Sequence, residues 1–190
     1  MQAFDVRSER VYSAHHTFLR IARQALIQAE IPVAWRDNAF LAITLSALSI
    51  EGFCNGLGAL DIERWERDFE SCSPRAKLRL LCMEFDLEFN PDVQPWADAL
   101  WLIKIRNRIA HPKLEPINIV ARVSTQAEAN AKHREMPLSK IEQECTVENA
   151  RRALNAVDAL IAYFADKAPN GLDLRFDSWS ASTHEQFVGA

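Results

Sequence analysis

The stretch DNAFLAITLSALSIEGFCNGLGAL, residues 37–60, is apolar on nearly every side of a helical projection. Because a surface helix keeps one polar face, this pattern predicts a helix buried in the middle of a bundle. Gly56 and Gly58 weaken its C-terminal end. Glu51 is the one charged side chain after Asp37, and a carboxylate in such apolar surroundings requires a partner in the folded chain.

Four further segments have helical apolar spacing, and two of them begin with capping residues. Ser73 followed by Pro74 is a typical helix start, with a capping hydroxyl and a proline at the first helical position. Thr146 begins the last predicted helix, with Glu148 and Asn149 in its first turn. These predicted helices span residues 11–29, 73–85, 95–110 and 146–164.

We therefore expect an all-α fold, an antiparallel bundle of four to five helices. Residues 1–168 would form this single domain, with a less regular insertion at 117–145 before the last helix. The mixed-charge run at residues 61–70 is interpreted as a short surface helix. Residues 169–190 would form an extended C-terminal tail that lies over the body or over a partner. The aromatic residues of this tail are Phe176, Trp179 and Phe187.

The overall composition limits the classes of function. The chain has 190 residues, 48% of them hydrophobic, which is enough for one core. Its net charge of −4 and pI of about 5.8 argue against the broad basic surface of a general nucleic-acid binder. Any contact with phosphate must therefore be local.

Cysteine spacing and hydropathy bear on metals and on location. The cysteines form no CxxC pair and no Cys/His pattern of a zinc site, so we expect reduced, mostly buried thiols, no metal site and no cofactor. The N-terminus is polar where a signal peptide is apolar, and the longest apolar run, residues 39–50, is shorter than a bilayer span. We expect a soluble, cytoplasmic protein with no membrane association. The cysteines are Cys54, Cys72, Cys82 and Cys145.

A local basic stretch, IRNRIAHPK at residues 105–113, ends the fourth predicted helix. Pro112 disfavours helical backbone at His111, so the helix should end near Ala110. Because helix C-termini favour cations, the macrodipole alone explains part of this charge. No acid interrupts the stretch. Its cations, with the lysine that precedes it, are Lys104, Arg106, Arg108 and Lys113.

Residues 106–111, Arg-Asn-Arg-Ile-Ala-His, resemble the RxxxxH signature of the HEPN superfamily, in which asparagine commonly follows the arginine. By helix order the resemblance covers residues 39–112, and only the motif is specific. It implies a small all-α homodimer that acts as a metal-independent endoribonuclease, with two motifs meeting across a cleft at the dimer interface. It also implies catalytic roles for Arg106, Asn107 and His111.

A second match to the same pattern, residues 10–15, lies at the start of the first predicted helix. There the residue after the arginine is apolar, and His15 lies beside Val11 and Phe18 on the stripe that should be buried. We interpret His15 as a core or edge histidine.

Cleavage of RNA without a metal requires a base for the ribose 2′-hydroxyl, an acid for the 5′-oxygen and a cation beside the phosphate. One histidine supplies one proton function. A dimer with two His111 side chains would supply both, and the products would be a 2′,3′-cyclic phosphate and a 5′-hydroxyl. Arg106 would hold the phosphate, and Asn107 would contact the imidazole or its neighbouring backbone and fix the tautomer.

The remaining polar residues near the motif have expected supporting roles. Glu51 would pair with Arg106 or Arg108 and orient it. Asn55, one turn after Glu51, would complete the same polar cluster or would form a simple helix-end hydrogen bond. The residues expected to bind the RNA backbone are Lys104, Arg108 and Lys113.

RNA is thus the expected substrate, and the resemblance suggests a defence, toxin or stress system with an antitoxin or another protein as a partner. Two alternatives remain open. One is a non-catalytic helical dimerisation module that binds RNA, a nucleotide or a protein without turnover. The other is a purely structural dimerisation unit, in which the arginines serve the helix dipole and ion pairs.

Overall fold

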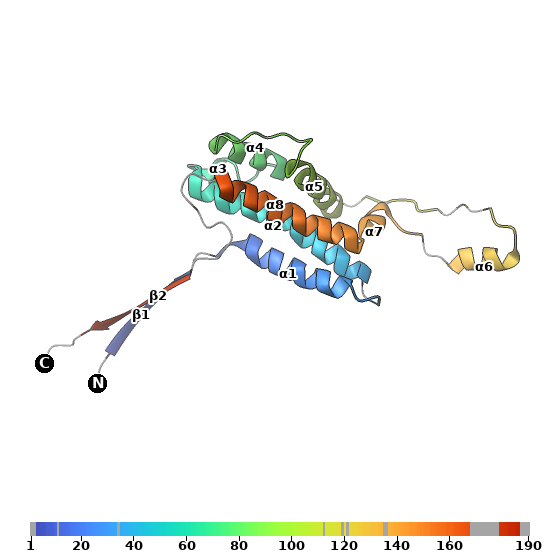
Figure 1. The fold of residues 1–190 in the computed structure, drawn as a ribbon, viewed down its shortest axis with the longest axis horizontal. Helices are drawn as coiled ribbons and strands as arrows, with labels where there is room; N and C mark the ends of the chain where they lie inside the picture. Colours follow the sequence, from blue (N-terminus) through green and yellow to red (C-terminus); the bar gives the residue numbers. More distant parts are fainter. Residues whose placement is uncertain are drawn as a thin grey trace.

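Helix α2 (Trp35–Asp61) runs through the centre of the computed structural model, which describes residues 3–10, 12–33, 35–111, 113–118, 120, 122–134, 137–167 and 179–186. Side chains on several sides of α2 are buried, as its apolar sequence predicts. The main helices packed around it are α1 (Ala14–Ala29), α4 (Pro74–Glu84), α5 (Trp96–Ala110) and α8 (Val147–Lys167) (Figure 1). The predicted all-α bundle is confirmed, and the stretch at 37–60 forms its core helix.

The capping signals in the sequence mark true helix starts. Ser73 Oγ accepts a hydrogen bond from the Ala76 N–H at 3.3 Å, and Pro74 is the first residue of α4. Thr146 Oγ1 accepts a hydrogen bond from the Asn149 N–H at 3.1 Å at the start of α8. Each hydroxyl satisfies one of the N–H groups that a helix start leaves without a partner.

The insertion before the last helix, residues 117–145, contains the short helices α6 (Gln126–Arg134) and α7 (Lys140–Glu144). Ser139 and Glu142 form a capping box at the start of α7, with hydrogen bonds of 3.2 and 2.7 Å. The bond from the Ser139 backbone N–H to the Glu142 carboxylate lowers the pKa of Glu142, because it favours the charged form. Helix α7 packs on α5, whereas α6 lies apart from the bundle in Figure 1.

The two ends of the chain pair with each other. Strands β1 (Ala3–Arg10) and β2 (Trp179–Gln186) form an antiparallel pair along their whole length. The middle of the C-terminal tail is therefore extended, but its partner is an N-terminal strand that the sequence analysis did not predict. Phe176 and Phe187, which we expected to lie over the body or over a partner, fall outside the described residues.

The mixed-charge run at residues 61–70 contains the short helix α3 (Trp65–Asp68). Its charged residues from 63 to 70 face solvent, as predicted, whereas Asp61 is partly buried and Trp65 is only 2% exposed. The indole lies directly on Gly58 of α2, where an added Cβ would be 2.3 Å from Trp65 Cδ2. Gly58 therefore allows α3 to close over the end of α2.

Helix α2 is also the one helix in the described ranges that is long and apolar enough to cross a membrane, with a mean hydropathy of 1.4 in its most apolar window. Half of that window is buried inside the bundle. Core helices of globular domains can have the same length and composition, so these two properties do not distinguish a core helix from a membrane-spanning one.

Replacing Gly58 with alanine should destabilise the protein, because the new methyl group would overlap the Trp65 ring. We expect the free energy of unfolding to fall by about 3 kcal/mol, measured by urea denaturation with circular dichroism. Gly56→Ala is the matched control, since its nearest atom would be 3.5 Å away. That variant should gain about 0.5–1 kcal/mol of helix propensity, and equal losses at both positions would contradict the packing described.

The cysteines offer a second test of the fold. All four are free, and Cys54, Cys82 and Cys145 are buried. Burial raises the pKa of Cys82 to about 12 and that of Cys145 to about 11, and it raises the pKa of Cys54 further. Because these thiols are protonated and inaccessible at pH 8, a thiol reagent should rapidly modify only Cys72 in the folded protein. Mass spectrometry would identify the modified residue, and fast labelling of Cys82 or Cys145 would contradict this core.

Candidate functional site

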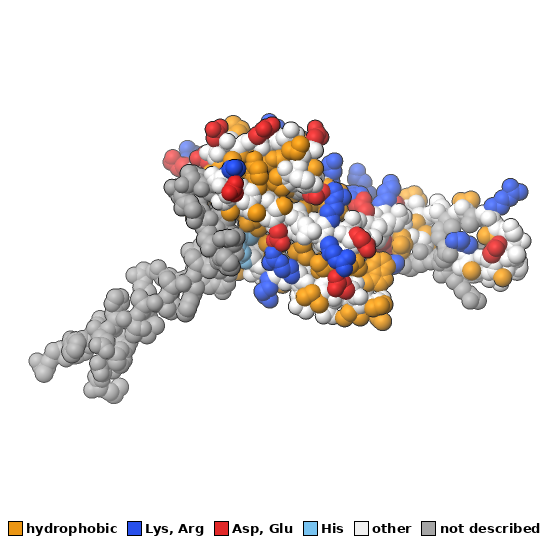
Figure 2. All heavy atoms as spheres, in the orientation of Figure 1, with side chains coloured by type: hydrophobic (Ala, Val, Ile, Leu, Met, Phe, Trp, Pro, Cys, Tyr) orange, Lys and Arg blue, Asp and Glu red, His pale blue; other side chains and the backbone are white. Residues whose placement is uncertain are grey.

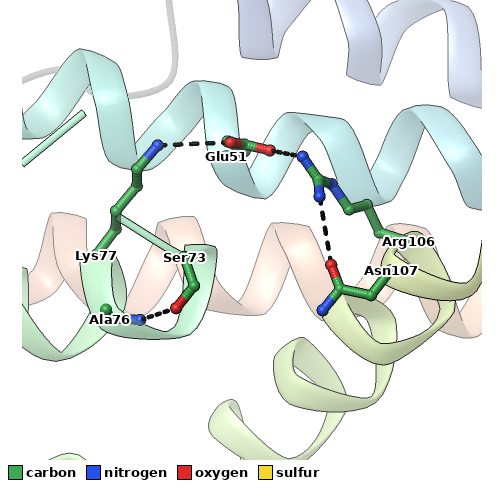
Figure 3. Close-up of polar contacts among 6 residues, drawn as sticks. All are labelled: Glu51, Ser73, Ala76, Lys77, Arg106 and Asn107. Carbon is green, nitrogen blue, oxygen red and sulfur yellow. Dashed lines mark hydrogen bonds and ion pairs between the residues drawn. The ribbon is translucent and has the colours of Figure 1, made fainter. Parts of the chain in front are cut away.

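Glu51, near the middle of α2, lies between two cations from different helices (Figure 3). Arg106 of α5 donates a hydrogen bond from Nη2 to Glu51 Oε2 at 2.7 Å. Lys77 of α4 approaches Glu51 Oε1 from the other side, with its Nζ at 3.5 Å. The predicted ion pair between Glu51 and the basic end of α5 is therefore confirmed, and its partner is Arg106.

Lys77 is a member of this cluster that the sequence analysis missed. Its side chain is 1% exposed, so its charge depends on the carboxylate of Glu51. A signal was present in the sequence, because Lys77 occupies the buried stripe of α4 together with Leu78 and Leu81. A lysine on the buried face of a helix requires a carboxylate from a neighbouring helix. Glu51, a carboxylate within an apolar helix, requires a cation for the same reason.

Asn107 does not have the position that we expected. Its Oδ1 accepts a hydrogen bond from Arg106 Nη1 at 3.3 Å (Figure 3), so its side-chain amide contacts the arginine and not the imidazole. The backbone N–H of His111 does bond to the Asn107 carbonyl at 3.0 Å, but that is the last bond of the helix. No hydrogen bond from the Asn107 amide to the imidazole is present in the described structure, and the tautomer-fixing role of Asn107 stays a prediction.

Arg108 faces a different partner. Its guanidinium forms an ion pair with Glu144 of α7, and its Nε is buried without a hydrogen-bond partner in the described part of the chain. The contact attaches α7 to the last turn of α5. Arg108 thus contributes a structural contact in this conformation, and its guanidinium is less available to a ligand than the sequence suggested.

Besides Asn107, three polar side chains near the motif are exposed, and within the described ranges none of these three forms an ion pair or a side-chain hydrogen bond. His111 is the C-cap of α5, which ends at Ala110 as Pro112 predicts. In Figure 2, Lys and Arg side chains gather along the edge of the molecule where α5 ends. The three exposed residues are Lys104, His111 and Lys113.

Asn55 does not join the Glu51 cluster. Asn55 follows Glu51 by four residues, so it lies about 6 Å further along the axis of α2. At that point α2 is beside the start of α1. There it lines a separate pocket of about 290 Å³ together with Ser13 and Trp65. Its Oδ1 is buried without a hydrogen-bond partner among the described residues. No hydrogen bond joins Asn55 to Glu51 or Arg106 among the described residues, and its supporting role stays a prediction.

His15, in the second match to the motif, is a core residue as predicted. It is 5% exposed, and its Nδ1 lies 2.5 Å from Ser13 Oγ. Its ring packs edge-on against Phe53 of α2, with the ring centroids 5.6 Å apart. Gly52 makes room for this contact, because a Cβ there would be 3.2 Å from the His15 backbone nitrogen. Burial and packing explain His15 without a catalytic role.

A groove lies between the start of α4 and one face of α5, beside Asn107 and with a volume of about 610 Å³. We call it the α4–α5 groove. Its walls include Ser73 and Arg75 from the start of α4 and Trp101 and Lys104 from α5. The exposed Lys104 and Asn107 of the motif region therefore open onto a concave surface that sequence spacing alone did not indicate.

In the part of the chain that the structure describes, no three His, Cys, Asp or Glu side chains are placed to hold a metal ion. Comparisons with protein-family models, with curated proteins and with solved structures found no match. The candidate site of this chain is therefore the pair of Glu51 and Arg106 together with the basic end of α5.

The Glu51 cluster predicts an unequal response to mutation. Glu51→Gln should reduce the free energy of unfolding by about 3 kcal/mol, because Lys77 would be left buried without a carboxylate. Lys77→Met should cost less, since Glu51 keeps Arg106. The double variant Glu51→Gln/Lys77→Met should recover most of the loss, as measured by urea denaturation.

The matched control is Glu88→Gln, which alters an exposed carboxylate that has no ion pair within the described ranges. It should change the free energy of unfolding by less than about 0.5 kcal/mol. If the double variant is as unstable as Glu51→Gln alone, burial of an unpaired Lys77 is not the cause of the loss.

Proposed function

We propose that this chain is a metal-independent endoribonuclease of the HEPN type that acts as a homodimer. The observation that supports the proposal is the way Arg106 is held. Glu51 and Asn107 each bind one of its terminal nitrogens, at 2.7 and 3.3 Å. The Arg106 side chain is 25% exposed, so it is oriented by the protein while part of it still reaches solvent. An oriented cation of this kind suits a phosphate that gains charge during cleavage.

The arrangement of Arg106 and His111 favours a site shared by two copies. His111 follows Arg106 by five residues, which is about 140° further round a helix. Within one chain, the two side chains therefore leave α5 in different directions, and no contact joins them in the described structure. A second copy would supply the second imidazole that the proton transfers require.

In the proposed reaction the ribose 2′-oxygen attacks the adjacent phosphorus, and the bond from phosphorus to the 5′-oxygen breaks. One His111 takes the 2′-hydroxyl proton, and His111 of the second copy gives a proton to the departing 5′-oxygen. Arg106 stabilises the additional negative charge on the phosphate oxygens. The products are a 2′,3′-cyclic phosphate and a 5′-hydroxyl, with no net gain or loss of protons.

A second candidate is RNA binding without cleavage, and the ion pairs favour it. Arg106 and Arg108 are both engaged by carboxylates, Glu51 and Glu144, which reduces the charge available for catalysis. Lys104 remains exposed beside the α4–α5 groove. This arrangement would suit retention of an RNA strand. In either case, the resemblance of the motif extends the proposal to a toxin, defence or stress system with an antitoxin or other protein partner.

The decisive test is incubation of the purified protein with labelled single-stranded RNA in EDTA. The parent should produce fragments with 2′,3′-cyclic phosphate ends, and Arg106→Lys should cut at least tenfold more slowly. Lysine can keep the ion pair with Glu51 but lacks the planar fork that holds a phosphate at two points. His111→Ala should abolish cutting, and sedimentation should show a dimer.

Arg79→Ala is the control for this assay. Arg79 lies on α4, is exposed and has no ion pair in the described structure, so its removal should leave the cleavage rate unchanged. Equal cutting by the parent and by His111→Ala would show that a contaminating nuclease or another residue is responsible. If the parent cuts no RNA in a varied panel but binds it, the second candidate is favoured.

A further inference from the structure

The α4–α5 groove runs along one face of α5. Its α5 lining residues recur every three or four positions, from Ala97 through Leu100 and Lys104 to Asn107. This spacing places them in one row about 15 Å long. One end of the row is Asn107, which is hydrogen-bonded to Arg106. The groove is therefore an elongated surface that begins at the motif. Its shape suits an extended polymer better than a compact small molecule.

Two cations line the groove from opposite sides. Arg75 comes from the first turn of α4 and Lys104 from α5. Both side chains are exposed, and neither forms an ion pair within the described ranges. Asp92 is the one carboxylate in the described lining, so the groove carries a net positive charge. In a protein with a net charge of −4, this is a local site for an anion.

The rest of the α5 wall of the groove is largely apolar and aromatic. Leu100, Trp101 and Ile103 provide that surface. The Trp101 ring is held in place by Arg152 of α8, whose guanidinium carbon lies 4.2 Å from the ring centroid. Arg152 is fixed in turn by hydrogen bonds of 2.8 and 2.5 Å to Asp98. An aromatic ring in the same groove as two cations suits a ligand that alternates anionic groups with flat rings.

We infer that the α4–α5 groove binds a single-stranded segment of RNA, with phosphates at Arg75 and Lys104 and a base against Trp101. The direction of the strand, towards Arg106, rests on the proposed function, whereas the binding itself does not. An acidic peptide would use the cations but would gain little from the aromatic surface. Arg75 and Trp101, two residues outside the motif, would therefore bind RNA.

The test is fluorescence anisotropy with a labelled single-stranded 2′-O-methyl RNA, which cannot be cleaved because its 2′-oxygens are blocked. The variant Arg75→Ala/Lys104→Ala should bind at least tenfold more weakly than the parent. The slope of log K against log salt should become shallower by about 1.4, since each lost phosphate contact contributes about 0.7. Trp101→Leu should weaken binding about fivefold or more, and Trp101→Phe should retain most of the affinity.

Two exposed arginines outside the groove provide matched controls. Arg79 lies on α4, one turn after Arg75, and Arg20 lies on α1. Neither lines the groove or forms an ion pair in the structure as described. Arg79→Ala and Arg20→Ala should bind like the parent. Equal weakening by the controls, unchanged binding by the double variant, or no binding by the parent would each overturn the inference. A thermal melt of each variant separates lost affinity from lost folding.

Parallel assays separate this inference from the proposed function. If the parent cuts unmodified RNA and the groove variants bind normally, the groove is not the RNA path and the nuclease proposal stands. If the parent never cuts but loses affinity in the groove variants, the groove assignment stands alone. A poly-glutamate peptide that binds with the same dependence on Arg75 and Lys104, but with no dependence on Trp101, would replace RNA by an acidic partner.

Discussion

The carboxylate of Glu51 carries one negative charge between two positive ones, and three helices meet through it. Lys77 is buried, and this carboxylate is the anion that its ammonium group contacts. Arg106 is only partly buried and is oriented by the same group. With two cations and one anion, the cluster has a net positive charge. One interaction therefore joins α2, α4 and α5 and also presents the cation on which the proposed chemistry depends.

This dual role links stability to the site. One oxygen of Glu51 contacts Lys77 of α4, and the other contacts Arg106 of α5. A shift of α4 relative to α2 would therefore move the carboxylate, and with it the guanidinium that is hydrogen-bonded to it. Asn107 limits such movement from the α5 side through its bond to Arg106. The α4–α5 groove lies between the same two helices. Occupation of the groove and the orientation of Arg106 are therefore expected to be coupled through the spacing of α4 and α5.

Much of the fold follows from local sequence signals. The starts of α4 and α8 follow from Ser73 and Thr146, and the end of α5 follows from Pro112, because caps and prolines act on neighbouring residues. The central position of α2 follows from its lack of a polar face. The pairing of β1 with β2 could not be predicted in this way. Its two strands lie at opposite ends of the chain, and apolar and polar residues alternate over only four residues of each, 4–7 and 179–182.

The candidate site was predictable to a smaller extent. A carboxylate within an apolar helix needs a cation, so the Glu51 to Arg106 pair could be anticipated. The direction of the Asn107 side chain depends on which donor is nearer, and the partner of Arg108 depends on where α7 docks. Neither the direction of Asn107 nor the partner of Arg108 can be predicted from the spacing of residues along the sequence. The groove likewise arises from the packing of α4 against α5, and Arg75 and Trp101 share no sequence motif.

The antiparallel pairing of β1 and β2 brings the two described ends of the chain together, and Figure 1 shows both on the opposite side of the bundle from α6. A fusion protein or an affinity tag at either terminus would therefore be attached at nearly the same place, away from the end of α5. The same proximity makes the chain suitable for circular permutation. The old termini could be joined by a short linker and new ones opened beside α6, which lies apart from the bundle.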